Sequence, residues 1–249
     1  MARARLVGDW ERELKRRIGR RYGDMARDGS FAPGGADKLT TAGYPGDWVR
    51  RLPKDIAAAY SGCGFPFAGL AFDKLRRVVD LGCGAGIDAL YIAQQLAPGG
   101  TVTAIDLAPE MLARAAGATG AAGWLNRDKI RFLAADMERL PLAPECADLV
   151  VANASLNLAA DKGRALGEMF RILAPGGRFV ARDLVRNGPL PAEVLSDPLS
   201  YNTSLGGALE EKELYSALSE AGFAEIEISD HRPFSMLETV LIRAAKAPV

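Results

Sequence analysis

From residue 77 onward, short apolar runs alternate with stretches whose apolar residues recur at helical spacing. The runs rich in Val, Ile and Leu predict strands at 77–81, 101–106, 130–133, 147–152 and 178–185. The helical spacing predicts helices at 87–96, 109–116 and 161–173. This alternation is typical of a parallel sheet with helices on both faces, so we expect an α/β fold.

The alternation ends with the fifth strand. Residues 187–207 lack periodicity and predict an inserted loop, and residues 210–221 predict a helix. The runs 224–229 and 237–244 predict two strands whose short connection contains Pro233. Because so short a connection suits an antiparallel pair, we expect a seven-stranded, mostly parallel sheet with a C-terminal antiparallel pair.

The first quarter of the chain has a different pattern. Residues 6–27 predict an amphipathic helix, residues 28–53 are rich in Gly and Pro and predict a loop, and residues 54–60 predict a short helix. We therefore divide the chain into an N-terminal helical cap with a lid loop, residues 1–75, and an α/β domain, residues 76–249.

Composition and charge limit the function classes. With 249 residues, 49% of them hydrophobic, the chain can bury one sizeable core. Its formal net charge is zero, which gives no indication of nucleic-acid binding. No apolar run reaches the ~18 residues of a membrane span, and the 3 scattered cysteines suit neither a disulfide framework nor a metal site. We expect a cytoplasmic monomer or homodimer with a small-molecule substrate, and no nucleic-acid, membrane or metal partner.

A glycine-rich loop follows the first predicted strand. It carries Gly82, Gly84 and Gly86, but a dinucleotide-binding loop would place its third glycine where Ile87 stands. No Gly-Lys-Ser/Thr sequence follows, so the phosphate-binding loop of nucleotide triphosphatases is excluded as well. Asp80, at the end of the strand, would repel a diphosphate and attract an ammonium or sulfonium group. The expected ligand is therefore cationic, as S-adenosylmethionine is.

Polar side chains also follow the neighbouring strands. Asp106 ends the second strand, about 20 residues past the glycines, where Rossmann-like folds use a carboxylate to accept ribose hydroxyls. Asp136 and Met137 follow the third strand and could contact an adenine amino group and ring. Asn153 ends the fourth strand. Since the carboxyl ends of parallel strands meet at one edge, these side chains are expected to line one crevice.

Four segments resemble the motifs of class I S-adenosylmethionine-dependent methyltransferases. They are VVDLGCGAG at 78–86, AIDLAPEML at 104–112, ADMERLP at 135–141 and LAPGGR at 173–178. The resemblance implies a Rossmann-like fold with the helical cap as a lid, and S-adenosylmethionine as cofactor. The expected cofactor contacts are Asp80, Gly82, Cys83, Gly84, Asp106, Leu107, Met111, Asp136, Met137 and Asn153.

A narrower resemblance is to arsenite methyltransferases. The segments that carry it are YGDMA at 22–26, GCGFP at 62–66, NASLNL at 153–158 and SLGGAL at 204–209. Most of the cysteines that bind arsenic in that family are missing here, since Ala154, Leu156 and Ser204 occupy their segments and only Cys63 remains. Arsenite is soft and needs two or three thiolates, so we favour a small organic substrate, with specialised metabolism as the expected setting.

Candidate catalytic residues are those expected on the lid or at the carboxyl edge of the sheet: Tyr22, Cys63, Asn157 and Asp183. Each also has a structural interpretation, respectively lid packing, a small buried hydrophobe, a turn former and a hydrogen-bonding brace. His231, the single histidine, is interpreted as a surface or core residue, with a general base as the alternative. The side chains expected to close the substrate pocket are Tyr44, Trp48, Tyr201 and Asn202.

Three functions follow from these observations. A small-molecule methyltransferase is preferred. An arsenite or thiol methyltransferase that depends on Cys63 is the second, and arsenite-dependent turnover tests it. The third is a cofactor-binding protein, or a cyclase that uses the sulfonium of S-adenosylmethionine without transferring its methyl group, and the mass of the product separates it from the other two.

Overall fold

The computed structural model describes residues 2–31, 34–121, 127–191, 193–194, 200 and 205–248. Its helices are α1 (Ala2–Asp28), α2 (Gly35–Ala42), α3 (Gly46–Val49), α4 (Lys54–Ala58), α5 (Ile87–Gln95), α6 (Pro109–Ala121), α7 (Lys162–Ile172) and α10 (Glu211–Glu220), with short 3₁₀ turns η1 (Arg127–Lys129) and η2 (Leu156–Leu158). Its strands are β1 (Arg77–Leu81), β2 (Thr101–Asp106), β3 (Ile130–Ala134), β4 (Ala147–Asn153), β5 (Leu173–Arg186), β6 (Leu209–Glu210), β7 (Ala224–Phe234) and β8 (Leu237–Ala245).

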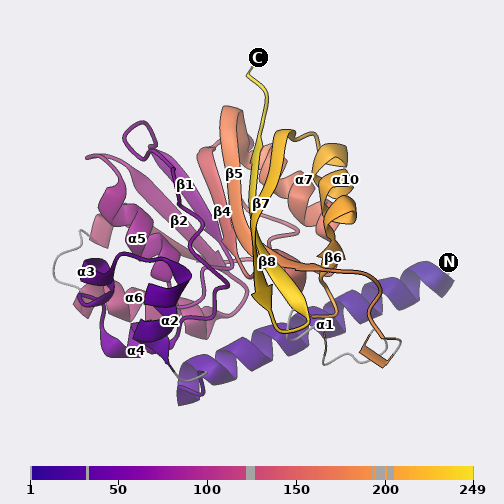
Figure 1. Cartoon of the computed structure of the whole chain (residues 1–249), viewed down its shortest axis with the longest axis horizontal. Coiled ribbons are helices and arrows are strands. Elements are labelled where there is room, and N and C mark those ends of the chain that lie inside the picture. Colours follow the sequence, from indigo (N-terminus) through magenta and orange to yellow (C-terminus); the bar gives the residue numbers. More distant parts are fainter. Residues whose placement is uncertain are drawn as a thin grey trace.

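Within the described residues the strands form one sheet in the order β3-β2-β1-β4-β5-β8-β7 (Figure 1). The strands β1 to β5 pair in parallel, and β8 pairs antiparallel with both β5 and β7. The expected α/β fold and its C-terminal antiparallel pair are therefore confirmed. The two-residue strand β6, which pairs with the end of β5, is an eighth strand that the sequence pattern did not predict.

The sheet is buried on both faces because its central strands are apolar at nearly every position. Val78 packs into one hydrophobic cluster with α5 and the N-terminal helices α2 to α4, whereas the next residue, Val79, packs into a second cluster with α7 and α10. Figure 1 shows these two sets of helices on opposite sides of the sheet. Consecutive residues of a strand point to opposite faces, so one run of apolar residues supplies two cores.

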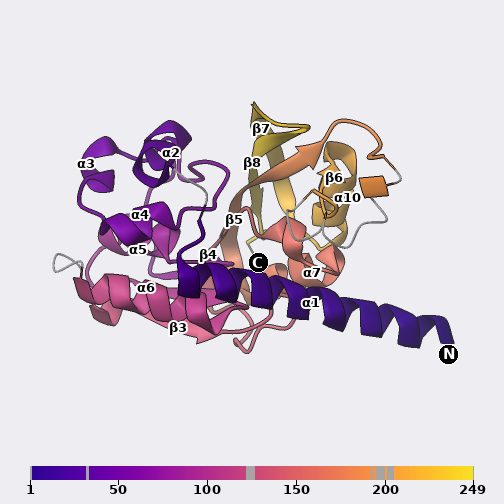
Figure 2. The same ribbon diagram turned by 90° about the horizontal axis from the view of Figure 1, so that it is seen from below.

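The helix α1 lies across the sheet-and-helix body rather than within either layer (Figure 2). It packs mainly against α6, and Ala26 of α1 is buried with Ala108 and Met111. The expected N-terminal helix is thus confirmed. The division of the chain at residues 75 and 76 stays a prediction, because one hydrophobic cluster includes residues from both sides of it.

The loop predicted at residues 28–53 is wrong in part, because it contains the helices α2 and α3. Gly34 and Gly43 adopt positive φ at the two ends of α2. These glycines therefore delimit a short helix rather than continue a loop. The helices are held by burial of Leu39 and Trp48.

Two other boundaries differ from the sequence expectation. The strand β5 begins at Leu173, directly after α7, so the predicted start at residue 178 is wrong. The strand β7 continues to Phe234 and includes His231 and Pro233, which were expected in a connection. Proline is tolerated there because β7 is an edge strand, where a missing N–H breaks no ladder bond. Tyr201, Asn202 and Ser204 lie outside the described residues. No helix in the described part of the chain is long and apolar enough to span a membrane.

Candidate functional site

A cavity of about 1000 Å³, including its open mouth, lies at the carboxyl edge of the strands β1, β2 and β4. The helix α1 covers part of it with Lys15, Ile18 and Tyr22. All the expected cofactor contacts except Asp80 line this cavity, namely Gly82, Cys83, Gly84, Asp106, Leu107, Met111, Asp136, Met137 and Asn153. The carboxyl edge of a parallel sheet is where open α/β folds bind their ligands.

The glycine loop is fixed by the end of β2. The amide N–H of Gly84 donates to Oδ2 of Asp106 at 2.8 Å, and Oδ1 of Asp106 accepts from the N–H of Ala108 at 2.8 Å. Burial raises the pKa of Asp106, although these backbone bonds oppose the shift. Gly84 has φ 51°, and a Cβ there would meet nothing within 4 Å. Asp106 therefore holds the loop in a shape that keeps the space above Gly84 open.

Asp80 is not among the residues that line the cavity. Its side chain is buried, and its Oδ2 has no hydrogen-bond partner. Burial, together with the negative charges of Asp88 and Asp106, raises the pKa of Asp80 well above its ordinary value. A buried acceptor without a partner is costly, so this carboxyl group favours a cationic or hydrogen-bond-donating ligand nearby.

Asp88 is a cavity residue that the sequence analysis missed. It stands in the first turn of α5, where it accepts a hydrogen bond from Oη of Tyr44 at 2.5 Å and another from Nδ2 of Asn153 at 3.0 Å. Burial raises the pKa of Asp88 to about 6, and the two hydrogen bonds limit the shift. The available signal was a carboxylate inside the otherwise apolar stretch 87–93, whose residues are all buried.

Asn153 connects this carboxylate to the segment that contains Cys63. Its Oδ1 accepts from the N–H of Cys63 at 3.0 Å, while its Nδ2 donates to the carbonyl of Gly64 at 2.9 Å as well as to Asp88. The Cys63 thiol itself does not line the cavity. It donates to the carbonyl oxygen of Arg182 at 3.1 Å, and burial raises its pKa well above the ordinary value. The thiolate form is therefore disfavoured in this structure.

Of the four candidate catalytic residues, Tyr22 alone lines the cavity among the described residues. Burial raises the pKa of the Tyr22 phenol. Asp183 lies behind the cavity wall, where its carboxylate accepts from the N–H groups of Leu156 and Leu184, and burial raises its pKa to about 6. Asn157 donates from Nδ2 to the carbonyl of Leu184 at 2.7 Å. Asp183 and Asn157 thus brace the turn after β4, and their catalytic roles stay predictions.

Tyr44 and Trp48, which were expected at the substrate pocket, belong to the core instead. Their rings stack with centroids 5.6 Å apart, and both side chains are buried. They join a group of packed aromatic side chains with Tyr60, Phe65, Phe67, Phe72 and Tyr91. The Gly/Pro-rich stretch therefore supplies packing, and Tyr44 contributes to the cavity indirectly through its hydrogen bond to Asp88.

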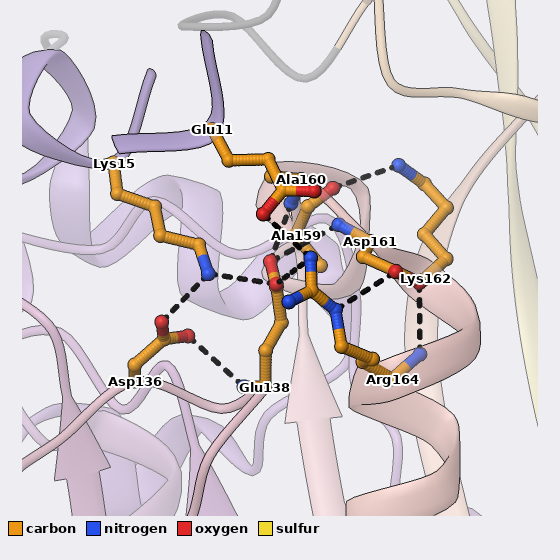
Figure 3. Close-up of polar contacts among 9 residues, drawn as sticks. All are labelled: Glu11, Lys15, Asp136, Glu138, Ala159, Ala160, Asp161, Lys162 and Arg164. Carbon is orange, nitrogen blue, oxygen red and sulfur yellow. Dashed lines mark hydrogen bonds and ion pairs between the residues drawn. The ribbon is translucent and has the colours of Figure 1, made fainter. Parts of the chain in front are cut away.

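A network of ion pairs holds α1 against the part of the cavity that is lined by Asp136 and Glu138 (Figure 3). Nζ of Lys15 donates to Oδ2 of Asp136 and to Oε2 of Glu138, both at 2.7 Å. The side chain of Glu138 is buried and also accepts from the N–H groups of Ala160 and Asp161. Glu138 thus joins the lid helix to the loop before α7, and no local sequence pattern predicts this connection.

The cavity has a strong excess of acids. Its described lining residues include one cation, Lys15, and four carboxylates, those of Asp88, Asp106, Asp136 and Glu138, and Lys15 is paired with the last two. Such a wall disfavours phosphate groups and favours a positively charged ligand. Carboxylates at the ends of β2 and after β3 can accept from ribose hydroxyls and from an amino group.

The three cysteines are separated by the fold. Cys83 is buried in the glycine loop, Cys63 lies behind Asn153, and Cys146 immediately precedes β4. Because a strand as long as β4 extends for roughly 20 Å, Cys146 lies at the opposite edge of the sheet from the cavity. No group of three or more His, Cys, Asp or Glu side chains able to hold a metal ion occurs in the described part of the chain.

Known proteins resemble this chain in sequence and in structure. A family described as a methyltransferase domain matches residues 72–222. An arsenite methyltransferase of Halobacterium salinarum is 35% identical over 195 residues, which are 78% of this chain and 48% of that protein. A demethylmenaquinone methyltransferase of Thermus thermophilus is 41% identical over 45% of this chain and 49% of its own length. The chain therefore spans about half the length of these curated relatives.

A solved structure extends the similarity to most of the chain. It is the crystal structure of an arsenic (III) S-adenosylmethionine methyltransferase from Chlamydomonas reinhardtii. The two structures share 27% sequence identity and superpose with a TM-score of 0.65, covering 88% of this chain and 75% of that one.

Proposed function

Because the chain belongs to the class I S-adenosylmethionine-dependent methyltransferases, we propose that it methylates a small organic molecule. The observation that carries this proposal is the combination of an acidic cofactor cavity with a dispersed set of cysteines. When bound, S-adenosylmethionine supplies an electrophilic methyl group on a sulfonium. Specialised metabolism remains the setting that we propose for the reaction.

The residues that line the cavity fit this cofactor. Asp106 is proposed to accept from the ribose hydroxyls, as carboxylates do at this position of Rossmann-like folds. Asp136 and Met137 are proposed to contact the adenine, because they lie next to Asp106 at the end of β3. The Oδ2 of Asp80, which has no hydrogen-bond partner, and the acidic lining of the cavity support the proposal that a positively charged group of the cofactor lies at the glycine loop.

The proposed role of the protein in the transfer is alignment and exclusion of water. The helix α1 covers the cavity with Ile18 and Tyr22, and the ion pairs of Lys15 hold it there. Fixing two reactants in line can lower a barrier by roughly 7–11 kcal/mol. Tyr22 is proposed to contact the substrate, and the raised pKa of its phenol makes it a hydrogen-bond donor rather than a base at neutral pH.

A second candidate function is arsenite methylation, which the names of the relatives and the presence of Cys63 favour. The structure supplies few ligands for it. Ala154 and Leu156 cannot bind arsenic, and the Cys63 thiol donates to a backbone carbonyl instead of facing the cavity. We therefore rank it below the small-molecule proposal.

The deciding experiment supplies methyl-deuterated S-adenosylmethionine to the whole chain. One arm contains arsenite with a reducing thiol, and the other contains a panel of phenols, amines and carboxylic acids. The proposal predicts labelled product in the organic arm and none with arsenite, by mass spectrometry. Labelled methylarsenic that disappears in Cys63→Ser, but persists in the remote control Cys146→Ser, would establish the second function instead. Conversion of an organic substrate without label in the product would indicate the cyclase.

A further inference from the structure

Beside the glycine loop lie two buried carboxyl groups without an ion-pair partner among the described residues: Asp88, which lines the cavity, and Asp80, which does not. Asp80 and Asp88 lie close enough to influence each other, and each is at most 7% exposed. The donors that reach Asp88 are a phenol and an amide, from Tyr44 and Asn153, and neither carries charge. Within the described residues no Lys or Arg forms an ion pair with either carboxylate. When these groups are ionised, their negative charge is therefore left for a ligand to neutralise.

The ligand forms before and after methyl transfer differ in charge. S-adenosylmethionine carries an ammonium, a carboxylate and a sulfonium, and so has a net charge of +1. S-adenosylhomocysteine has lost the sulfonium and is neutral overall. We propose that the Asp80–Asp88 pair makes this cavity select the charged cofactor over its neutral product, so that loss of the sulfonium charge promotes product release. The inference depends on the cofactor of the family and not on the identity of the substrate.

Proton binding by Asp88 should tune this selection. Burial raises its pKa to about 6, whereas the hydrogen bonds from Tyr44 and Asn153 stabilise its ionised form. Other titratable groups around it come from the segment after α4, from β1, from the glycine loop and from β2, and they are Tyr60, Cys63, Asp80, Cys83 and Asp106. None of these is a base, and Lys15, the one cation among the described lining residues of the cavity, forms its ion pairs with Asp136 and Glu138 instead. Entry of a cation should therefore expel a proton from the pair.

The test measures dissociation constants of both compounds by calorimetry on the whole chain between pH 5 and 7. The wild type is expected to bind S-adenosylmethionine more tightly as the pH rises, with a smaller change for S-adenosylhomocysteine. The ratio of the two constants should favour S-adenosylmethionine by roughly tenfold at pH 7. Buffers of different ionisation enthalpy should also report proton release on S-adenosylmethionine binding near pH 6.

Three variants complete the test. Asp88→Asn is expected to reduce the preference for S-adenosylmethionine to about twofold and to remove most of its pH dependence. The control Asp73→Asn removes an exposed acid outside the cavity and should leave the preference unchanged. Tyr44→Phe keeps the carboxylate but removes a donor to it, so the pH dependence should shift to higher pH even if Asp88→Asn folds poorly. A preference that is independent of pH and of both cavity variants would overturn the proposal. Absence of binding by either compound would instead contradict the assignment of the cofactor.

Discussion

The ammonium of Lys15 lies 2.7 Å from Oδ2 of Asp136, and this contact joins the lid helix to the carboxyl end of β3. The same ammonium reaches the buried carboxylate of Glu138 at 2.7 Å. The hydrogen bonds to these acids raise the pKa of Lys15 although burial opposes them. Arg164 adds a further link from Glu138 to Glu11 of α1. The lid is therefore held to the cofactor cavity by charge rather than by apolar packing alone.

Lys15→Met should loosen the lid while keeping most of the apolar part of the side chain. Loss of the two contacts is expected to cost about 1 kcal/mol, which corresponds to roughly fivefold faster dissociation of S-adenosylhomocysteine. Stopped-flow or surface plasmon resonance measures the rate. Because salt screens ion pairs, added NaCl should accelerate release from the wild type more than from the variant. Arg16→Met, which removes an ion pair internal to α1, is the matched control. Equal dissociation rates in the wild type and both variants would contradict the proposal that the ion pairs of Lys15 hold the lid.

Two glycines of one loop should respond differently to alanine. At Gly82 a Cβ would lie 2.3 Å from Cβ of Ser155, and φ is 70°, so Gly82→Ala should cost roughly 2–4 kcal/mol of unfolding free energy. At Gly84 the space is open, so Gly84→Ala should cost only about 1–2 kcal/mol for its positive φ. The methyl group that Gly84→Ala introduces is expected to weaken cofactor binding instead. Urea unfolding and calorimetry on both variants measure these effects. Equal loss of stability in the two variants would contradict the assignment of Gly82 to close packing and of Gly84 to the cofactor-binding surface.

The ligand-free protein should become less stable as the pH rises from about 4.5 to 6.5. Burial raises the pKa of Asp88 and of Asp183 from an ordinary value of 3.8 to about 6. Between those values the folded state holds more protons than the unfolded state, so the free energy of unfolding falls with increasing pH. The expected fall is about 2–4 kcal/mol for the two groups together.

Urea unfolding at several pH values measures this fall, and Asp88→Asn should remove about half of it. Carboxylates with lowered pKa, such as Asp148 and Asp161, act below this window and leave the sign unchanged. A free energy of unfolding that rises steadily from pH 4.5 to 6.5 would show that the two buried carboxyl groups are not protonated as described.

Local sequence pattern was sufficient to predict the parts of the site that belong to one strand and the turn after it. Asp106, Asp136 and Asn153 follow apolar runs directly, so their place at one sheet edge followed from the parallel order of the strands. The glycine loop was likewise predictable, because it connects a predicted strand directly to a predicted helix. Its spacing also excluded a dinucleotide, because Ile87 replaces the third glycine.

Contacts between distant segments were not predictable in this way. Lys15 and Asp136 are separated by 121 residues, and a lysine on an amphipathic helix is ordinarily solvated. The tertiary fold likewise decided that Tyr44 would pack in the core and hydrogen-bond to Asp88, while Cys63 would turn from the cavity toward a carbonyl. Such placements depend on which helix packs on which strand, and one sequence contains no local signal for that.

The measurement that tests the account most directly is a calorimetric titration of the whole chain with S-adenosylhomocysteine and, separately, with NAD. The acidic wall and the glycine loop predict one molecule of S-adenosylhomocysteine bound per chain and no binding of the diphosphate-bearing NAD. Binding of NAD without binding of S-adenosylhomocysteine would contradict the central claim that these carboxylates form a binding site for a cationic adenosyl cofactor.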